Sequence, residues 1–378
     1  MPKRVLFVVN EDSFFLSHRL PLAQHAIKMG YEVYLLSSDT GHRELLENYG
    51  IKCVTIPFEN SGTNPIHEIR CILLLVKWYR KLKPDIIHQI TLKATFLGSI
   101  AAKIARCRNV INAISGFGFV FTDGRRGLVT RILELLLPLS FKSRYASFIL
   151  QNPDDYGFVI NKNWVPSSNV FLIKGSGVDL NKFKYYPPTS ETRLVVLFPA
   201  RVLRDKGVLE FIEAAQQLKE EYFDKLHFII AGDCNCANPT SLSSEELQMH
   251  LIPGYLDWIG YQSDMLSVFR NSHIVVLPSY REGLPKSLIE ACAIGRPIIT
   301  TDAIGCRECV IHGYNGFLVT LKNSQEIAES IKSILSNSEH RIQMGVNSRT
   351  LAERVFSIES VIDKTFSIYD RYFTTETK

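Results

Sequence analysis

The 378 residues are too many for one ordinary core and suit two domains of roughly 180 residues. With 46% hydrophobic and 21% charged residues, the composition is that of a globular protein and excludes an intrinsically disordered one, and no apolar run approaches the ~20 residues of a transmembrane helix. The net charge of +5 is divided unequally, because residues 1–185 have a net charge of +10 and residues 186–378 one of −5.

The first half of the chain alternates short apolar runs with amphipathic segments. Met1-Pro2-Lys3-Arg4 leads directly into the first apolar run, so we expect no signal peptide. The alternation predicts an α/β fold with a doubly wound, Rossmann-like parallel sheet. The predicted strands are Arg4–Val9, Glu32–Leu36, Ile51–Ile56, Ile86–His88, Val110–Ala113 and Phe148–Gln151, and the predicted helices include Leu20–Met29, Gly41–Tyr49, Ile66–Leu82 and Ala94–Ala105.

A second alternation of the same kind follows a proline-containing connector at Asn181–Thr192, where we expect the break between domains. We therefore place the first domain at 1–185 and the second at 190–356. Two doubly wound domains of this kind would face each other across a cleft that binds the ligand. The predicted elements of the second domain are Leu194–Ala200, Val208–Glu220, His227–Gly232, Leu256–Ile259, Met265–Arg270 and Ile274–Pro278.

Two carboxylates eight residues apart, Glu282 and Glu290, mark the most informative segment. The apolar run His273–Ser279 predicts a buried strand before them. Pro285 at the start and Gly295 just past the end predict a helix over Lys286–Ile294. Such a helix N-terminus lies at the carboxyl edge of a parallel sheet, where α/β proteins bind phosphorylated ligands. A nucleotide sugar, anionic and rich in hydroxyls, fits this pocket. The alternative is that one glutamate caps the helix and the other is a surface residue.

Several other segments of the second half occur in a characteristic order around the segment that carries Glu282 and Glu290. They are Ala200–Gly207, Pro278–Ala291, Gly295-Arg296-Pro297, Thr301-Asp302, Gly305–Glu308 and Gly313–Val319. In this order they resemble the retaining glycosyltransferases of the GT-B type with a Glu-x7-Glu motif, glycosyltransferase family 4. The resemblance covers essentially the whole chain and is strongest to bacterial N-acetylgalactosaminyltransferases that act on polyprenyl-diphosphate-linked sugars.

The resemblance implies transfer of a sugar, such as N-acetylgalactosamine (GalNAc) or another N-acetylhexosamine, from a UDP-sugar to an undecaprenyl-diphosphate-linked saccharide, with retention of configuration. It implies a place in bacterial surface polysaccharide or glycan assembly, with no metal and no cofactor beyond the UDP-sugar co-substrate. Two alternatives stay open: a nucleotide-sugar epimerase of GT-B architecture, and a non-catalytic UDP-sugar-binding protein. The eight cysteines are expected to be reduced thiols, because their spacing does not match a usual zinc site.

Two cations in the second domain are candidates for holding the donor diphosphate. Arg201 and Lys206 follow the predicted strand Leu194–Ala200, at its carboxyl edge. Cationic side chains there would stabilise the charge that grows on the departing diphosphate. The alternative is a pair of solvated surface cations, which is the usual situation of Lys and Arg.

The Glu-x7-Glu segment supplies the remaining donor contacts that we expect. Leu284, Lys286 and Ser287 would bind the diphosphate at the start of the predicted helix. The resemblance implies that Glu290 binds the ribose hydroxyls. It further implies that Glu282 faces the sugar ring as a catalytic residue.

The first domain contributes a catalytic histidine and the acceptor residues. His88, at the carboxyl end of a predicted strand, is expected by resemblance near the donor sugar, although a half-buried histidine bonded to a backbone carbonyl is an equal alternative. His18 and Arg19 follow the first strand and would line the acceptor site, with Arg19 attracted to the acceptor diphosphate. The loop around Phe117 would form an acceptor lid. NAD binding is disfavoured because the first turn lacks a glycine-rich motif.

The excess positive charge of residues 1–185 indicates that this half meets an anionic surface. Because no nucleic-acid-binding motif accompanies the charge, we expect an anionic membrane and no nucleic acid, with the protein peripheral on the cytoplasmic face of the cell membrane. The segments Ile72–Lys83 and Arg125–Arg144 interleave apolar residues with cations, as interfacial helices do. Core helices with a solvated basic face are the alternative. By resemblance, a final helix at 357–378 would return to the first domain.

Overall fold

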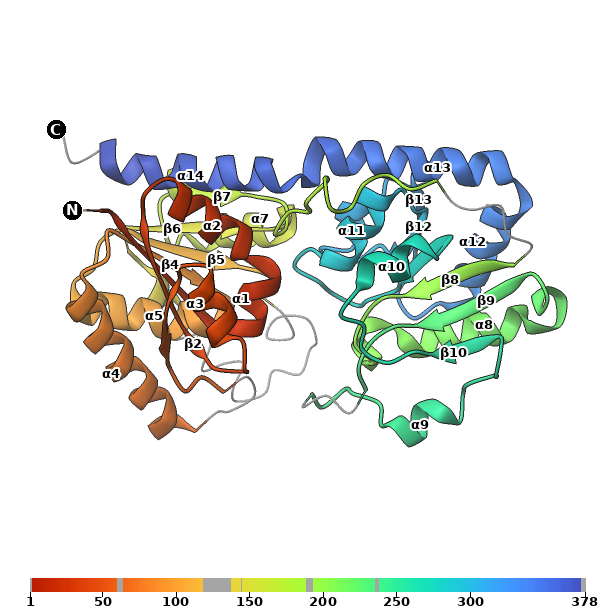
Figure 1. The fold of residues 1–378 in the computed structure, drawn as a ribbon, viewed down its shortest axis with the longest axis horizontal. Coiled ribbons are helices and arrows are strands. Elements are labelled where there is room, and N and C mark those ends of the chain that lie inside the picture. The colour runs from red at the N-terminus through yellow and green to blue at the C-terminus, as the bar shows by residue number, and fades with distance from the viewer. Residues whose placement is uncertain are drawn as a thin grey trace. The chain divides into compact units, whose positions relative to one another are not determined.

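The computed structural model describes residues 2–59, 64–117, 137–143, 145–187, 193–234 and 238–374. The chain divides into two compact units (Figure 1), here called unit 1, Met1–Ser176 with Glu359–Lys378, and unit 2, Gly177–Ile358. The break therefore lies about nine residues before the expected domain end. The reason is a backbone pairing: Val178 donates to the carbonyl of Phe356 and accepts from the amide of Ile358, which ties the connector to unit 2.

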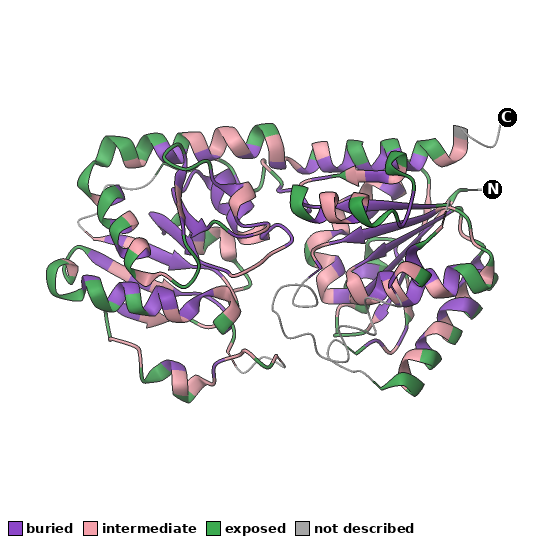
Figure 2. Ribbon diagram, turned by 180° about the vertical axis from the view of Figure 1, so that it is seen from behind, coloured by how far each residue is buried: buried purple, intermediate pink, exposed green. Residues whose placement is uncertain are grey.

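Unit 1 is built on a seven-stranded sheet in the order β3-β2-β1-β4-β5-β6-β7, with parallel pairing throughout. The predicted doubly wound sheet is thus confirmed. Figure 2 shows that the strands are mostly buried, as expected of a parallel sheet covered by helices on both faces. The strands are β1 Arg4–Glu11, β2 Glu32–Ser38, β3 Lys52–Thr55, β4 Ile86–Ile90, β5 Val110–Ile114, β6 Ala146–Leu150 and β7 Val170–Leu172.

The helices of unit 1 pack on this sheet through apolar faces, and the C-terminal helix α14 contributes to its core. The side chain of Asn64 accepts a hydrogen bond from the amide of Ile66 and so caps α4, whose first residue is Pro65. The helices are α1 Asp12–His18, α2 Leu20–Lys28, α3 Arg43–Asn48, α4 Pro65–Leu82, α5 Leu92–Ala105, α7 Pro153–Lys162, η2 Ser167–Asn169 and α14 Ile358–Thr374.

Unit 2 repeats the design with a six-stranded parallel sheet in the order β10-β9-β8-β11-β12-β13. Its strands are β8 Leu194–Phe198, β9 Leu226–Ile230, β10 Leu256–Trp258, β11 Ile274–Leu277, β12 Ile298–Thr301 and β13 Gly316–Val319. Its helices are η3 Arg204–Lys206, α8 Val208–Tyr222, α9 Ser244–Gln248, α10 Met265–Arg270, α11 Lys286–Ile294, η4 Arg307–Cys309, α12 Ser324–Ser336, α13 Ser338–Leu351 and η5 Ala352–Phe356.

Each sheet reverses its strand order at one place, between β1 and β4 in unit 1 and between β8 and β11 in unit 2. The loops that leave two such strands at their carboxyl ends run to opposite faces of the sheet and leave a crevice, which is the usual ligand site of open α/β sheets. In unit 2 these two loops are 199–207 and 278–285, the segments that carry most of the predicted donor residues.

Candidate functional site

The loop after β11 is built as the sequence predicts. All four residues of β11 are buried, and α11 spans Lys286–Ile294 with Gly295 after it at φ +85°. One detail differs: Pro285 is the extended cap residue (φ −71°, ψ 120°) and not the first helical residue. Its carbonyl accepts the amide of Leu288, so the helical hydrogen bonds begin there. The start of α11 therefore lies at the carboxyl edge of the sheet.

The loops after β8 and β11 pack directly on each other. The backbone amide of Tyr280 donates to the carbonyl of Asp205 at 2.9 Å. Gly207, at φ +75°, makes this approach possible, because a Cβ there would lie 2.2 Å from the carbonyl oxygen of Pro278. The sequence provides the glycine, but only the fold reveals what it contacts.

This packing brings together two predicted site residues from different loops, Lys206 and Glu282. The Lys206 ammonium forms an ion pair with the Glu282 carboxylate, and the side chains are only 21% and 14% exposed. Ser279 donates to the same carboxylate oxygen at 2.9 Å. A carboxylate held by a cation and a hydroxyl has a fixed orientation, and a partly buried pair is less screened by solvent than a surface pair.

The turn that carries Glu282 is supported from behind by the loop after β12. The Glu282 amide donates to the carbonyl of Ile304, and Gly305 follows at φ +79°, where a Cβ would lie 2.3 Å from the Glu282 carbonyl oxygen. Burial, with a contribution from the Glu282 charge, raises the pKa of Cys306 to about 12. This thiol is therefore protonated and packs against the turn. The described residues contain no group of three or more His, Cys, Asp or Glu arranged for a metal ion.

Glu290, the second acid of the motif, is 8% exposed and so is not a surface residue. Burial raises the pKa of its carboxyl group, an effect opposed by Lys286 at 3.4 Å on the preceding turn and by Lys182. Two other predicted contacts lie beside it: Ser287 is half-buried and Leu284 is 8% exposed. The motif thus presents a buried acid and a paired acid on one loop and helix.

The two arginines after β8, Arg201 and Arg204, lie in different surroundings. Arg204 pairs with Glu246 of α9, so its charge is balanced within the fold. Arg201 is exposed on the same loop, five positions before Lys206. Glu246 was not found by sequence reasoning, because nothing in its local pattern indicates a contact with residues 42 positions away.

His88 lies in the middle of β4 and not at its carboxyl end, so the expected position at a cleft edge is wrong. The strand continues to Ile90 because it pairs with β5 as far as Ala113. His88 is 2% exposed, its Nδ1 lies 2.7 Å from the Tyr369 hydroxyl of α14, and its Nε2 has no hydrogen-bond partner within the described residues. Burial, with a smaller effect of Arg19, lowers its pKa well below the usual range.

The predicted acceptor residues differ in exposure. Arg19 joins α1 to α2 and is 5% exposed, and burial lowers the pKa of its guanidinium to about 10. His18 is half-buried and stacks on Phe14, with ring centroids 4.1 Å apart. Phe117 is 1% exposed and contacts Trp164 edge-on in the core of unit 1, so its side chain is not part of an exposed lid. Residues 118–136, most of the predicted lid and interfacial segment, lie outside the described residues.

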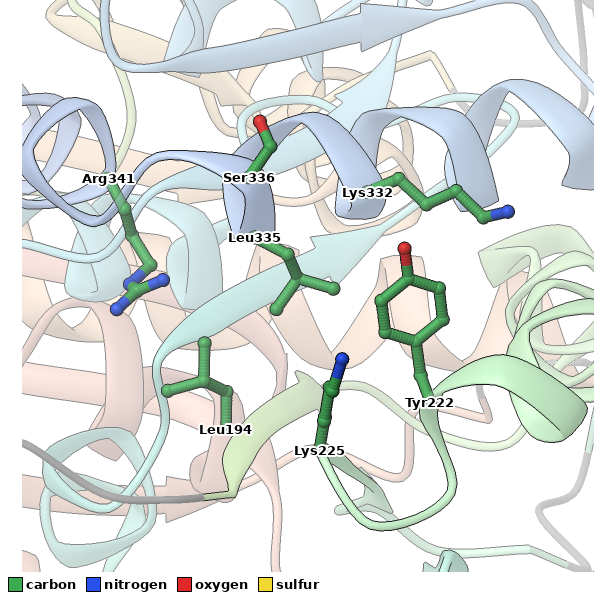
Figure 3. Close-up of a pocket in the computed structure, with 7 residues that line it drawn as sticks. All are labelled: Leu194, Tyr222, Lys225, Lys332, Leu335, Ser336 and Arg341. Atoms are coloured by element: carbon green, nitrogen blue, oxygen red, sulfur yellow. The ribbon is translucent and has the colours of Figure 1, made fainter.

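A cavity of about 380 Å³ lies at the opposite, amino-terminal edge of the unit 2 sheet. Figure 3 shows the side chains that line it, which come from the start of β8, the end of α8, the turn between α8 and β9, and the α12–α13 region. Lys332 is paired with Glu221 at 3.1 Å and lies over the ring of Tyr222, so its charge is balanced without a ligand. This cavity is separate from the candidate site.

Both halves of the chain match known protein families. Residues 4–151 match the model for glycosyl transferase 4-like proteins, and residues 182–351 match the model for glycosyl transferases group 1. The two matches lie largely in unit 1 and unit 2 respectively. The second covers both loops of the candidate site.

Characterised relatives align with nearly the whole chain. The N,N'-diacetylbacillosaminyl-diphospho-undecaprenol alpha-1,3-N-acetylgalactosaminyltransferase of Campylobacter jejuni is 28% identical over 97% of this chain and 98% of its own length. The UDP-Gal:alpha-D-GlcNAc-diphosphoundecaprenol alpha-1,3-galactosyltransferase of Escherichia coli is 25% identical over 90% of this chain and 89% of its own.

Solved structures share the fold at lower identity. Anabaena Alr3699/HepE, solved in complex with UDP-glucose, matches 96% of this chain and 99% of its own with a TM-score of 0.76 at 20% identity. A glycosyltransferase from Rickettsia africae matches 98% of this chain and 99% of its own, with a TM-score of 0.76 at 18% identity. The two Rossmann-like units thus form the GT-B fold.

Proposed function

This chain belongs to the glycosyltransferases that join a 4-like domain to a group 1 domain in the GT-B fold, and we propose that it transfers a sugar from a UDP-sugar to an undecaprenyl-diphosphate-linked saccharide. Two relatives named for diphosphoundecaprenol-linked acceptors, aligned over about nine tenths of the chain or more, support this acceptor class. The proposed donor sugar is an N-acetylhexosamine such as GalNAc, transferred with retention, and the proposed product is a bacterial surface polysaccharide or glycan.

The observation that carries the proposal is the Lys206–Glu282 ion pair at the β8–β11 crevice. A nucleotide diphosphate entering this crevice offers Lys206 more negative charge than one carboxylate does. The lysine would then turn to the phosphates together with Arg201, and Glu282 would be released to accept hydrogen bonds from the sugar hydroxyls. The buried Glu290 would accept bonds from the ribose, and Leu284, Lys286 and Ser287 at the start of α11 would complete the diphosphate site.

In the proposed reaction, the bond between the anomeric carbon and the β-phosphate oxygen breaks while an acceptor hydroxyl oxygen bonds to the same carbon on the same face. The hydroxyl proton passes to the departing phosphate oxygen, so the products are UDP and the extended saccharide. Lys206 and Arg201 stabilise the charge that develops on the leaving diphosphate. The proposed reaction uses no metal ion, because these two cations supply the positive charge.

The proposed acceptor side lies in unit 1. His18 ends α1, the helix that follows β1, and is proposed to approach the acceptor diphosphate. Arg19, His88 and Phe117 are buried, so any effect of theirs on the reaction would pass through neighbouring residues. Within the described ranges no helix is both long and apolar enough to span a bilayer. We propose that the protein meets its lipid-linked acceptor as a peripheral protein on the cytoplasmic membrane face.

The test is a donor screen with the full chain. UDP-sugars are incubated with a short polyprenyl-diphosphate-linked saccharide and the products are analysed by mass spectrometry. We expect the acceptor to gain the mass of one N-acetylhexosamine. Lys206→Ala should lower kcat/KM by about 10²–10³-fold, because one group that stabilises the leaving charge is removed.

Arg204→Ala is the matched control, because it removes a cation of the same loop that is already paired with Glu246. It should leave activity near that of the wild type. A changed UDP-sugar without acceptor would identify an epimerase, and UDP-sugar binding without turnover would identify a binding protein. Either result, or full activity of Lys206→Ala, would refute the proposal.

A further inference from the structure

The outer face of α4 carries an exposed apolar stripe. Ile66, Ile69 and Leu73 are 79%, 56% and 61% exposed. Their spacing of three and four residues places them on one side of the helix. The opposite side, including Cys71 and Leu75, is fully buried against the sheet and α5. The stripe is therefore not needed for the core of unit 1.

The same face becomes cationic toward the end of the helix. Lys77, Arg80 and Lys81 are exposed and continue the spacing of the apolar stripe. Residues 64–117 contain nine Lys and Arg against two acidic residues. One of these acids, Glu68, is 2.6 Å from the ammonium of Lys93 and lies off the stripe. The exposed positions of the α4 stripe thus combine apolar and cationic side chains without a carboxylate.

A shallow cavity of about 440 Å³ extends the cationic end onto the neighbouring element. It is lined by four cations, Arg80, Lys83, Arg106 and Arg108, and by one acid, Asp85. Asp85 already accepts a hydrogen bond from a backbone amide at 2.6 Å. The cavity therefore has spare positive charge at the level where α4 and α5 end.

We propose that this surface, the α4 face (Ile66, Ile69, Leu73, Lys77, Arg80 and Lys81), docks unit 1 on a bilayer that contains anionic lipid. Exposed aliphatic side chains insert below the headgroups, while lysines and arginines bind the lipid phosphates. Nucleic acid would use the cations but gives no role to three exposed aliphatic side chains. A protein partner would have to place acidic and apolar residues opposite the cations and aliphatic side chains of this surface. A lipid bilayer with anionic headgroups needs no such residue-by-residue match.

The direction of α4 fits this role and the proposed lipid-linked acceptor. In the β3–α4–β4 unit of a parallel sheet, the helix starts at the carboxyl edge and returns to the amino edge. The apolar end of the α4 face thus lies at the edge where α1, which ends with His18, follows β1 (Figure 1). Docking through α4 would place that edge of unit 1 near the headgroups.

The experiment is flotation of the full-length protein with vesicles. Wild type should float with phosphatidylcholine vesicles that contain phosphatidylglycerol and not with pure phosphatidylcholine vesicles. Lys77→Ala/Lys81→Ala should weaken binding about 30-fold, since each cation near an anionic surface contributes about 1 kcal/mol. Leu73→Asp should abolish flotation, because it adds a charge where the apolar end inserts.

Matched controls carry the same changes at exposed positions elsewhere. Lys28→Ala/Lys219→Ala matches the double lysine variant. Met29→Asp matches Leu73→Asp, because both side chains are 61% exposed. They should float like the wild type. The inference would be overturned if the controls lost flotation as much as the α4 variants, or if the α4 variants lost none. It would also be overturned if the wild type bound RNA but did not float with the vesicles. Transfer to a water-soluble short-chain acceptor should be unchanged in Lys77→Ala/Lys81→Ala. If the wild type floats but transfers no sugar, the proposed function fails while the docking surface stands.

Discussion

At the scale of single residues, the fold places two opposite charges of the proposed donor site in contact. Lys206 neutralises Glu282 in a position that is only partly exposed. An unpaired charge there would be costly, because burial removes water that would otherwise solvate it. In the proposed function, a diphosphate would replace this carboxylate as the anionic partner of Lys206. We infer that the ion pair holds both side chains in place at the proposed donor site.

His88 gives a prediction of pH dependence at the same scale. Burial lowers its folded-state pKa well below the usual range, so the folded protein keeps the ring neutral, whereas the unfolded chain binds a proton below about pH 6.5. The unfolded state then holds more protons, and the stability of unit 1 should fall as the pH drops through about 6.5, by up to about 1.4 kcal/mol per pH unit. This slope is measured by unfolding the protein in urea at pH 7.5 and at pH 5.5, with hydrogen exchange of the β4 amides as the readout.

The variant that isolates this effect is His88→Gln, which does not titrate and keeps a side chain able to bond with the Tyr369 hydroxyl. Its slope between the two pH values should be smaller than that of the wild type. His340→Gln, at an exposed histidine of unit 2, should leave the unit 1 slope unchanged. An identical slope in wild type and His88→Gln would show that this histidine is not held neutral by the fold.

At the scale of elements, the proposed donor site depends on how closely the loops after β8 and β11 approach each other. Gly207→Ala would place a methyl group 2.2 Å from the Pro278 carbonyl oxygen and would force the loops apart. Gly254→Ala is the matched control, because Gly254 has φ +74° but nothing within 4 Å of the added Cβ. Both variants carry the cost of a left-handed backbone, about 1–2 kcal/mol.

The difference between the two variants therefore measures the loop contact itself. We expect Gly207→Ala to destabilise unit 2 by about 2 kcal/mol more than Gly254→Ala, as steric overpacking does. It should also raise KM for the donor, since Lys206 and Glu282 move apart. Thermal unfolding and donor kinetics on both variants provide the comparison, and equal stabilities would mean that the loops adjust freely.

The same elements show what sequence reasoning can reach. Helix α11 was predicted with its correct ends, because proline and glycine mark its limits locally. The end of β4 was placed two residues early, since its last residues are defined by pairing with β5. The contact of Lys206 with Glu282 spans 76 positions and depends on the strand order, which no local pattern encodes. Burial of Phe117 likewise follows from tertiary packing with Trp164.

At the scale of the whole molecule, the chain begins and ends in the same unit. Glu359–Lys378 belongs to unit 1 although the preceding 182 residues form unit 2. Helix α14 supplies Tyr369, which bonds to His88 across 281 positions, and Phe366, which packs edge-on against His25. The segment Glu359–Lys378 therefore completes the core of unit 1, so the contacts of this core cannot all form until that segment is present.

A chain that lacks residues 359–378 should therefore lose the folded state of unit 1. The removed helix buries Val361, Ile362, Phe366, Ile368 and Tyr369, and at about 2 kcal/mol for each side chain the loss of about 10 kcal/mol approaches the total stability of a domain. Unit 2 lacks these contacts and should keep a cooperative thermal transition and bind UDP. Lys364→Ala/Ser367→Ala, on the exposed side of α14, controls for the helix itself. Protected unit 1 amides in the truncated chain, measured by hydrogen exchange, would contradict this dependence.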